Sequence, residues 1–155
     1  MHAALELDRD IDAAKPRLQI KRRYAVPREK VFRAWTDPAA LSRWMVPNAA
    51  NVPTKAQVDL RVGGAYRIEM TSPSGEVHVA LGLYRVVDPP SRLVFTWGWP
   101  ATPERVSLVT VVLREAEGGT ELTLTHEGFF DEAVRDSHEK GWTQLLGQLE
   151  PAGIA

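Results

Sequence analysis

The chain has 155 residues, of which 44% are hydrophobic and 25% charged, and its formal net charge at pH 7 is -1. A globular domain of this size buries roughly 70% of the surface of its unfolded chain, so the length leaves no room for a second core. The near-neutral charge excludes a broad electrostatic attraction to nucleic acid or to an anionic membrane.

The sequence contains no cysteine, which excludes disulfides and thiolate nucleophiles or metal ligands. It also contains no run of about 18 apolar residues, and charged side chains between Glu6 and Asp12 interrupt the region where a signal peptide needs an apolar core. We therefore expect a cytoplasmic protein that does not enter a membrane. Residues 1–16 are expected to form a loosely ordered extension, and residues 17–151 a single domain.

The first structural elements are a strand and two short helices. Residues 17–24 alternate between apolar and polar side chains, as a half-buried strand does. Pro27 suits the first position of a helix, because a missing N–H costs little there. Asp37 can cap the helix that follows, since its carboxylate can accept hydrogen bonds from the free amides of the first turn. Residues 47–53 are small or polar and are expected to form a loop.

From residue 55 the pattern becomes that of an antiparallel meander, in which short strands alternate with turns rich in Gly and Pro. The expected strands cover residues 55–60, 65–71, 76–87, 92–99, 105–114 and 120–127. The strand 76–87 is apolar on both faces, so its pattern does not indicate which face is buried.

A C-terminal helix is expected from near Phe129 to about Leu149. Side chains that recur every three or four residues share one helical face, here Phe130, Val134, His138, Trp142, Leu145 and Leu149. A histidine and a tryptophan therefore lie in an otherwise apolar stripe. A long helix on a curved sheet either packs against it completely or encloses a pocket, and the sequence favours a pocket.

Short motifs follow one another along most of the chain. They are Ala25-x-Pro27, Val31-Phe32-x-Ala34-Trp35-Thr36-Asp37-Pro38, Leu41-x-x-Trp44, Asp59-x-Arg61-x-Gly63-Gly64, Asp88-Pro89-Pro90-x-Arg92-Leu93-Val94-Phe95-Thr96-Trp97, Leu122-Thr123-Leu124-Thr125-His126 and His138-x-x-Gly141-Trp142. In this order, from about Leu18 to Leu149, the series resembles the START-like (SRPBCC, polyketide-cyclase-like) superfamily. Its branch is similar to the C-terminal domain of the activator of the ninety-kilodalton heat-shock protein ATPase.

The resemblance implies an α+β helix-grip fold. In this fold a curved antiparallel sheet wraps around a long C-terminal helix, two short helices follow the first strand, and a cavity lies between sheet and helix. The superfamily includes lipid carriers, hormone-binding proteins and aromatic-ring cyclases. Binding of a small hydrophobic or amphipathic molecule in the cavity is therefore the function that we expect first.

Two other functions stay open at this point. One is a cyclase, dehydratase or hydrolase in which His126, His138 or Tyr66 transfers protons. The other is a co-chaperone-like or other protein-interaction module. The separate N-terminal domain with which the eukaryotic activator engages its chaperone is missing from this sequence, which argues against a chaperone interaction. A homodimer is compatible with the sequence, and no cofactor is expected.

Most of the candidate ligand-binding residues are those that the strand and helix periods turn toward the expected cavity. The candidates are Trp44, Tyr66, Ile68, Met70, His78, Phe95, Trp97, His126, His138 and Trp142. His78 is the weaker histidine candidate, because the pattern does not orient its strand. Trp97 and Trp142 are expected on opposite walls, and aromatic walls with a few polar groups are typical of small-molecule pockets. Trp44 is alternatively an anchor for the second short helix.

His126 and His138 are the candidate catalytic residues, and each can equally be a hydrogen-bonded core histidine. Asp131 is either a carboxylate partner for His126 or the cap of the C-terminal helix. The spacing of the histidines matches no metal motif, so no metal site is expected.

Overall fold

Seven strands form one antiparallel sheet in the computed structural model, which describes residues 11–154 of the chain. Their order across the sheet is β1-β7-β6-β5-β4-β3-β2. The strands are β1 (Arg17–Tyr24), β2 (Lys55–Val58), β3 (Ala65–Thr71), β4 (Val77–Asp88), β5 (Arg92–Trp97), β6 (Ser107–Ala116) and β7 (Gly119–Glu127). The meander predicted from the sequence is therefore confirmed, with β1 and β3 at the expected residues.

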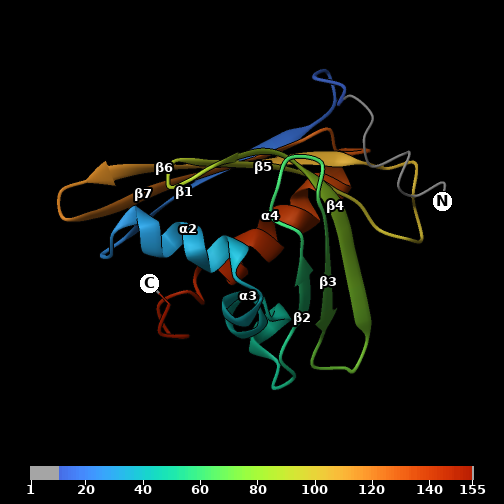
Figure 1. Ribbon diagram of the computed structural model, residues 1–155. Helices are drawn as coiled ribbons and strands as arrows, with labels where there is room; N and C mark the ends of the chain where they lie inside the picture. Colours follow the sequence, from blue (N-terminus) through green and yellow to red (C-terminus); the bar gives the residue numbers. More distant parts are fainter. Residues whose placement is uncertain (1–10, 155) are drawn as a thin grey trace.

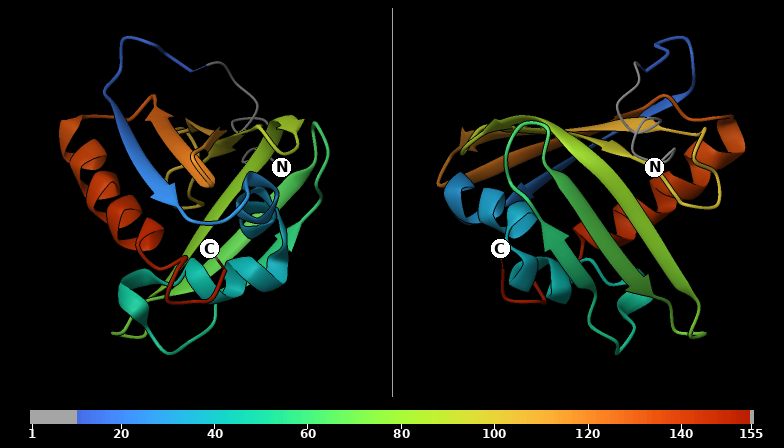
Figure 2. Two further views of the ribbon diagram at one scale, coloured as in Figure 1. Left: turned by 90° about the vertical axis from the view of Figure 1, so that its left-hand side faces the viewer. Right: turned by 45° about the vertical axis from the view of Figure 1, so that its right-hand side comes forward.

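The helices lie on the concave face of this sheet (Figure 1). They are α2 (Arg28–Thr36), α3 (Pro38–Trp44), the short 3-10 helix η1 (Pro47–Ala49) and α4 (Glu132–Leu146). The strands β2, β3 and β4 curl around beside α3, while α4 crosses the inside of the curve (Figures 1 and 2). This is the predicted helix-grip fold. No helix within residues 11–154 is long and apolar enough to cross a membrane.

Carboxylates cap two of the helices. Asp37 accepts a hydrogen bond from the Ala39 amide at 3.0 Å, as predicted. Asp131 accepts one from the Val134 amide at 2.9 Å, so it caps α4. Pro27 lies one position earlier than expected, because α2 begins at Arg28.

The start of the C-terminal helix differs from the expectation. The helix begins at Glu132, and Phe130 lies before it with 50% of its surface exposed, beneath the guanidinium of Arg105. Phe129 is the buried residue instead, and its ring centroid lies 4.2 Å from that of His126. Gly128 causes the difference: its φ of 84° turns the chain between β7 and the helix, so a helical period does not apply to Phe130.

The structure also orients β4, which its pattern left ambiguous. Ala80 and Tyr84 are buried, and His78 lies on the same concave face, opposite Met70 of β3. Gly82 lies between them because a β-carbon there would be 1.9 Å from the Thr96 carbonyl oxygen and 2.4 Å from the Tyr66 ring. Tyr66 thus packs across the strand where a side chain would otherwise stand.

The two halves of α4 differ in burial. Trp142, Leu145 and Leu146 of the second half are buried in the main core. In the first half only Val134, Arg135 and His138 are even partly covered. The second half therefore anchors the helix in the core.

The ends of the expected domain are only partly described. The first ten residues of the predicted extension lie outside the described residues. At the other end Ile154 is 5% exposed and belongs to the core, beyond the predicted limit at residue 151.

Candidate functional site

A cavity of about 310 Å³ lies between α4, η1 and the concave face of β3, β4 and β5. Its lining consists of Pro47, Asn48, Met70, His78, Trp97, Trp99, Ser137, His138, Gly141, Trp142, Gln144 and Leu145. Three of these residues are tryptophans, and none is Lys, Arg, Asp or Glu. The volume is at the lower end of the usual range for small-molecule pockets, about 300–1,000 Å³.

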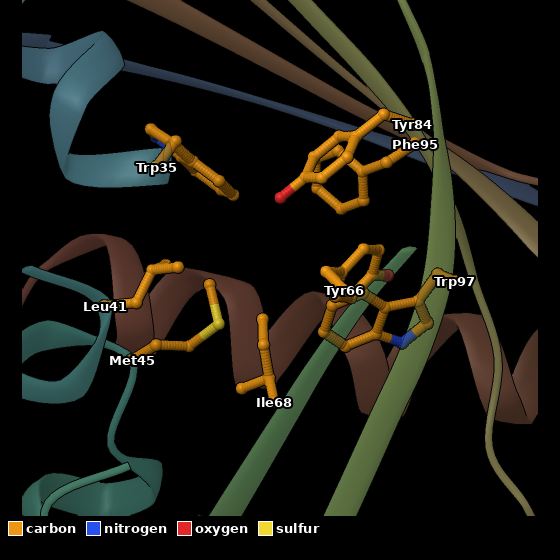
Figure 3. Close-up of a pocket in the computed structure, with 8 residues that line it drawn as sticks. All are labelled: Trp35, Leu41, Met45, Tyr66, Ile68, Tyr84, Phe95 and Trp97. Carbon is orange, nitrogen blue, oxygen red and sulfur yellow. The ribbon is translucent and has the colours of Figure 1, made fainter. Parts of the chain in front are cut away.

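A second, much smaller space lies deeper, toward α2 and α3. Eight side chains surround it, from Trp35 on α2 to Trp97 on β5 (Figure 3). Its volume is about 10 Å³, which is barely enough for one water molecule. The interior is therefore packed here. Among residues 11–154, Trp97 is the one side chain that borders both this space and the larger cavity.

The predicted ligand-binding residues divide between these places. Met70, His78, Trp97, His138 and Trp142 line the 310 Å³ cavity. Tyr66, Ile68 and Phe95 line the packed space instead.

Two of the predicted residues line neither space. Trp44 is fully buried and donates from Nε1 to the Ala34 carbonyl oxygen at 2.8 Å, so it anchors α3 against α2. His126 is also fully buried, beneath Trp142 and His138.

Trp97 and Trp142 are in contact rather than on separate walls. Their ring centroids are 5.2 Å apart, a distance typical of packed aromatic pairs. The open volume lies beside this pair, where Trp99, Gly141 and η1 complete the lining. Gly141 and Leu145 were accessible to sequence reasoning, since they lie three and seven residues after His138. Nothing in the sequence of the 47–53 loop indicates that Pro47 and Asn48 reach the cavity.

His126 has a hydrogen bond at each ring nitrogen, and together they determine its tautomer. Trp142 Nε1–H donates to Nδ1 at 2.9 Å, so Nδ1 is the acceptor. A neutral imidazole then carries its proton on Nε2, which lies 2.6 Å from Ser107 Oγ. Ser107 in turn donates to the Trp97 carbonyl oxygen at 3.2 Å. Every polar atom of this relay has a partner.

This direction of hydrogen bonding argues against Ser107 as a nucleophile. A serine is activated when the imidazole accepts its proton, but here Nε2 donates to the serine and Nδ1 is occupied by Trp142. Burial holds the pKa of His126 well below its usual value, and the proximity of His138 lowers it further. His126 is therefore neutral, and its role is to join α4 to the sheet.

His138 differs from His126 because one of its ring nitrogens has no hydrogen-bond partner within residues 11–154. Nδ1–H donates to the Val134 carbonyl oxygen at 2.9 Å, which leaves Nε2 as an acceptor. Nε2 is buried and has no hydrogen-bond partner among residues 11–154. Burial lowers the pKa of His138, and the hydrogen bond to Val134 partly opposes this shift. The ring of this neutral imidazole lines the cavity, while its Nε2 atom is closed off from solvent.

Trp97 also has a buried polar atom. It is 4% exposed, and its Nε1–H has no hydrogen-bond partner in the described part of the chain. In Figure 3 the benzene half of its indole faces the packed space, and its nitrogen lies on the far edge. Tyr66 offers no such group, because its hydroxyl donates to the Thr96 carbonyl oxygen at 2.6 Å and burial raises its pKa well above the usual value.

The described residues contain no group of three or more His, Asp or Glu side chains arranged to hold a metal ion. The cavity lining consists of aromatic walls, with amide and hydroxyl groups at the rim.

Solved structures with this arrangement of sheet and helices are numerous. Protein CV1439 from Chromobacterium violaceum is 29% identical, with a TM-score of 0.77 over 86% of this chain and 93% of its own. Protein NE0264 from Nitrosomonas europaea is 29% identical, with a TM-score of 0.74 over 92% and 96%. PFC0360w, an HSP90 activator from Plasmodium falciparum, is 29% identical, with a TM-score of 0.68 over 86% and 93%.

A search of the curated proteins found no significant match. Among protein families, the model described as "Activator of Hsp90 ATPase homolog 1-like protein" matches residues 25–152, from the end of β1 to beyond α4. This match covers most of the chain and all elements that form the cavity. The chain belongs to the family of activator of Hsp90 ATPase homologue 1-like proteins.

Proposed function

We propose that this protein binds a small hydrophobic or amphipathic molecule in the 310 Å³ cavity between α4 and the sheet. The observation that carries the proposal is the contrast between the two interior spaces. The space among α2, α3 and the sheet is filled by side chains to about 10 Å³, whereas the space beside α4 between Ser137 and Leu145 is left open. Protein interiors are normally close-packed, so an unfilled volume of this size is unusual. A bound ligand would account for it.

The lining supports an apolar occupant. Trp97, Trp99 and Trp142 offer large aromatic surfaces, and Met70 and Leu145 add flexible apolar ones. Burial of apolar ligand surface against such walls contributes roughly 25 cal/mol per Å² before the costs of association are subtracted. Asn48, Ser137 and Gly141 are exposed at the rim, which supports access from solvent on this side.

An enzyme is the second candidate, and His138 is the observation that favours it. Of the three groups considered for proton transfer, His126 and Tyr66 have their polar atoms engaged by other protein groups. Of the three, His138 has a buried ring nitrogen without a hydrogen-bond partner within residues 11–154, and its ring lines the cavity. A neutral imidazole in that position can accept a proton from a bound substrate.

Intrinsic tryptophan fluorescence and the melting temperature test the binding proposal together. A panel of fatty acids, flavonoids and polyketide-like aromatics is titrated into the protein. A ligand among the three tryptophans changes the emission and raises the melting temperature, because binding to the folded state alone stabilises it by about 2.7 kcal/mol at a hundredfold excess over Kd.

The matched control is Gly141→Phe. A β-carbon at Gly141 has no atom within 4 Å, so the backbone accepts a side chain at this position. Ser137 lies four residues before position 141 and Gln144 three residues after it, so both are neighbours of this position on the helix surface. The phenylalanine ring would lie between them and cover the mouth of the cavity. A ligand that shifts both signals in the parent protein and neither in Gly141→Phe supports the proposal. No response across the panel, or equal responses in both proteins, contradicts it.

A further inference from the structure

The 47–53 loop, which joins α3 to β2, forms one edge of the cavity. It begins with η1, which lies beside the second half of α4 (Figure 2). Pro47 and Asn48 of η1 line the cavity together with Gly141 and Gln144 of α4. Asn48 and Gly141 are both exposed, so the opening of the cavity lies between this loop and the helix.

Both ends of the loop are fixed to the body of the protein. At its start Gln148 Nε2 donates to the carbonyl oxygens of Trp44 and Val46, at 2.6 and 2.9 Å. At its end the hydroxyl of Thr54 donates to the Met45 carbonyl oxygen at 2.5 Å, and Thr54 is only 2% exposed. The loop is therefore anchored at Val46 and at Thr54.

The tip of the loop is held much less firmly. In the part of the chain that the structure describes, one hydrogen bond joins it to α4: Asn48 N–H donates to Gln144 Oε1 at 2.9 Å. Gln144 is oriented in turn by its own amide group, whose Nε2 donates to Gln148 Oε1. Asn48 makes this contact from the left-handed conformation, with φ 51° and ψ 36°, which Asn adopts more readily than most residues.

The loop also buries little apolar surface. Val52 is 46% exposed, and Asn51 and Pro53 are exposed as well. Segments with few buried contacts and solvent-exposed hydrogen bonds are those that open locally at low cost. The loss of one net hydrogen bond changes such an opening equilibrium about two- to tenfold. The Asn48–Gln144 hydrogen bond is therefore large enough to control how often the tip is open.

Resting on the proposed function, we propose that the 47–53 loop is a lid on the cavity and that Gln144 is the latch that holds it closed. When Asn48 N–H leaves Gln144, the tip moves away from α4 while Val46 and Thr54 keep their hydrogen bonds. The ligand enters and leaves through the gap between η1 and the helix. Gln144 thus sets the rate of ligand exchange and not the affinity, because the same opening serves entry and exit.

Gln144→Met tests the latch, because methionine has a similar length and cannot form this hydrogen bond. The probe is N-phenyl-1-naphthylamine, an uncharged dye whose emission rises in apolar surroundings. Stopped-flow mixing with the full chain gives its association and dissociation rates. We expect both rates to rise about two- to tenfold in Gln144→Met, and Kd to stay within about twofold of the parent value.

Two further variants separate the latch from a direct contact with the dye. Gln148 does not line the cavity, so Gln148→Met reaches the dye only through Gln144 and the anchored start of the loop. It should raise both rates as well. Gln19→Met is the matched control, because Gln19 also donates to a side chain at the surface, Thr125 Oγ1 at 3.2 Å, but lies on β1 away from the cavity. Its rates should equal those of the parent protein.

Two kinetic results would overturn the lid while leaving the cavity a binding site. One is a pair of rates that Gln144→Met does not change. The other is a weaker Kd with an unchanged association rate, which would make Gln144 an ordinary contact of the dye.

Hydrogen exchange of the parent protein, followed by NMR without any dye, tests the lid independently of binding. The Asn48 amide should exchange faster than the Thr54 amide, which donates to the Ser42 carbonyl oxygen at the anchored end of the loop. Equal protection of the two amides would overturn the lid. A lack of dye binding counts against the proposed function alone, because the exchange measurement still decides whether the tip opens.

Discussion

The indole Nε1–H of Trp142 donates to Nδ1 of His126 at 2.9 Å, and this contact places the proton of the buried imidazole on Nε2. The same hydrogen bond ties α4 to β7 beneath the cavity floor. The hydrogen bond therefore affects both the attachment of α4 to the sheet and the protonation of His126. Stability measurements on variants and at different pH values test these two effects separately.

Trp142→Phe should destabilise the protein more than Trp35→Phe. Both changes remove a similar volume from a buried site, but only the first leaves a buried acceptor, His126 Nδ1, without its donor. An orphaned buried polar group costs about 1–3 kcal/mol. Urea unfolding of the two variants gives the difference in the free energy of unfolding. Equal losses would show that the Trp142–His126 hydrogen bond adds nothing to stability.

Stability should fall as the pH is lowered through the range in which free histidine titrates. Burial lowers the pKa values of His126 and His138 in the folded state, whereas in the unfolded chain both titrate near 6.5. Below about pH 6.5 the unfolded state therefore binds more protons, and each histidine lowers the free energy of unfolding by up to about 1.4 kcal/mol per pH unit. The decline ends where the folded-state histidines are themselves protonated.

Urea unfolding at pH 7.5 and at pH 5.5 checks this dependence. His138→Gln removes one of the two titrating groups, so its stability should vary less steeply with pH over the same range. A free energy of unfolding that stays constant between the two pH values would contradict the buried, neutral state of both imidazoles.

His138→Gln should also leave ligand affinity within about tenfold of the parent value. Glutamine is polar and keeps an acceptor oxygen, but it is not basic. If His138 serves binding, its replacement changes Kd modestly and nothing else. Should a measured turnover disappear while binding persists, His138 is a proton-transfer residue and the enzyme function replaces the carrier function.

Gly141→Ala should stabilise the protein by about 0.5–1 kcal/mol, because Gly costs that much relative to Ala inside a helix. Gly141 lies inside α4, and a β-carbon there contacts nothing within 4 Å. Thermal unfolding measures the change, and the affinity for cavity ligands should be kept because a methyl group is small. A lower melting temperature would mean that the helix needs glycine at this position for its geometry.

The fold was predictable because its signals are local and repeated. The alternation in β1 and β3, the turns rich in Gly and Pro, and the motif series from Leu18 to Leu149 all specify the same arrangement. The error at Phe130 came from extending a helical period across Gly128, whose positive φ breaks it. Gly82 shows a second limit, since the approach of Tyr66 from a neighbouring strand leaves no trace in the sequence around the glycine.

The site was predictable only in part. A cavity forms where side chains leave space unfilled, and the sequence does not show where that happens. The strand period predicts that Tyr66, Phe95 and Trp97 all face the interior. The structure shows that Tyr66 and Phe95 line the packed space, whereas Trp97 also lines the open cavity. The hydrogen bonds of His126 to Ser107 and Trp142 join three elements far apart in the chain. No spacing rule reveals such a relay or the tautomer that it sets.

Native mass spectrometry of the protein purified from its own host tests the central claim most directly. The parent chain and Gly141→Phe are produced in parallel and analysed under gentle conditions. We expect part of the parent protein to carry a small organic molecule that denaturation releases and that the variant lacks. A parent protein that is consistently free of any adduct, or an adduct equally present on Gly141→Phe, would contradict ligand binding in the cavity between α4 and the sheet.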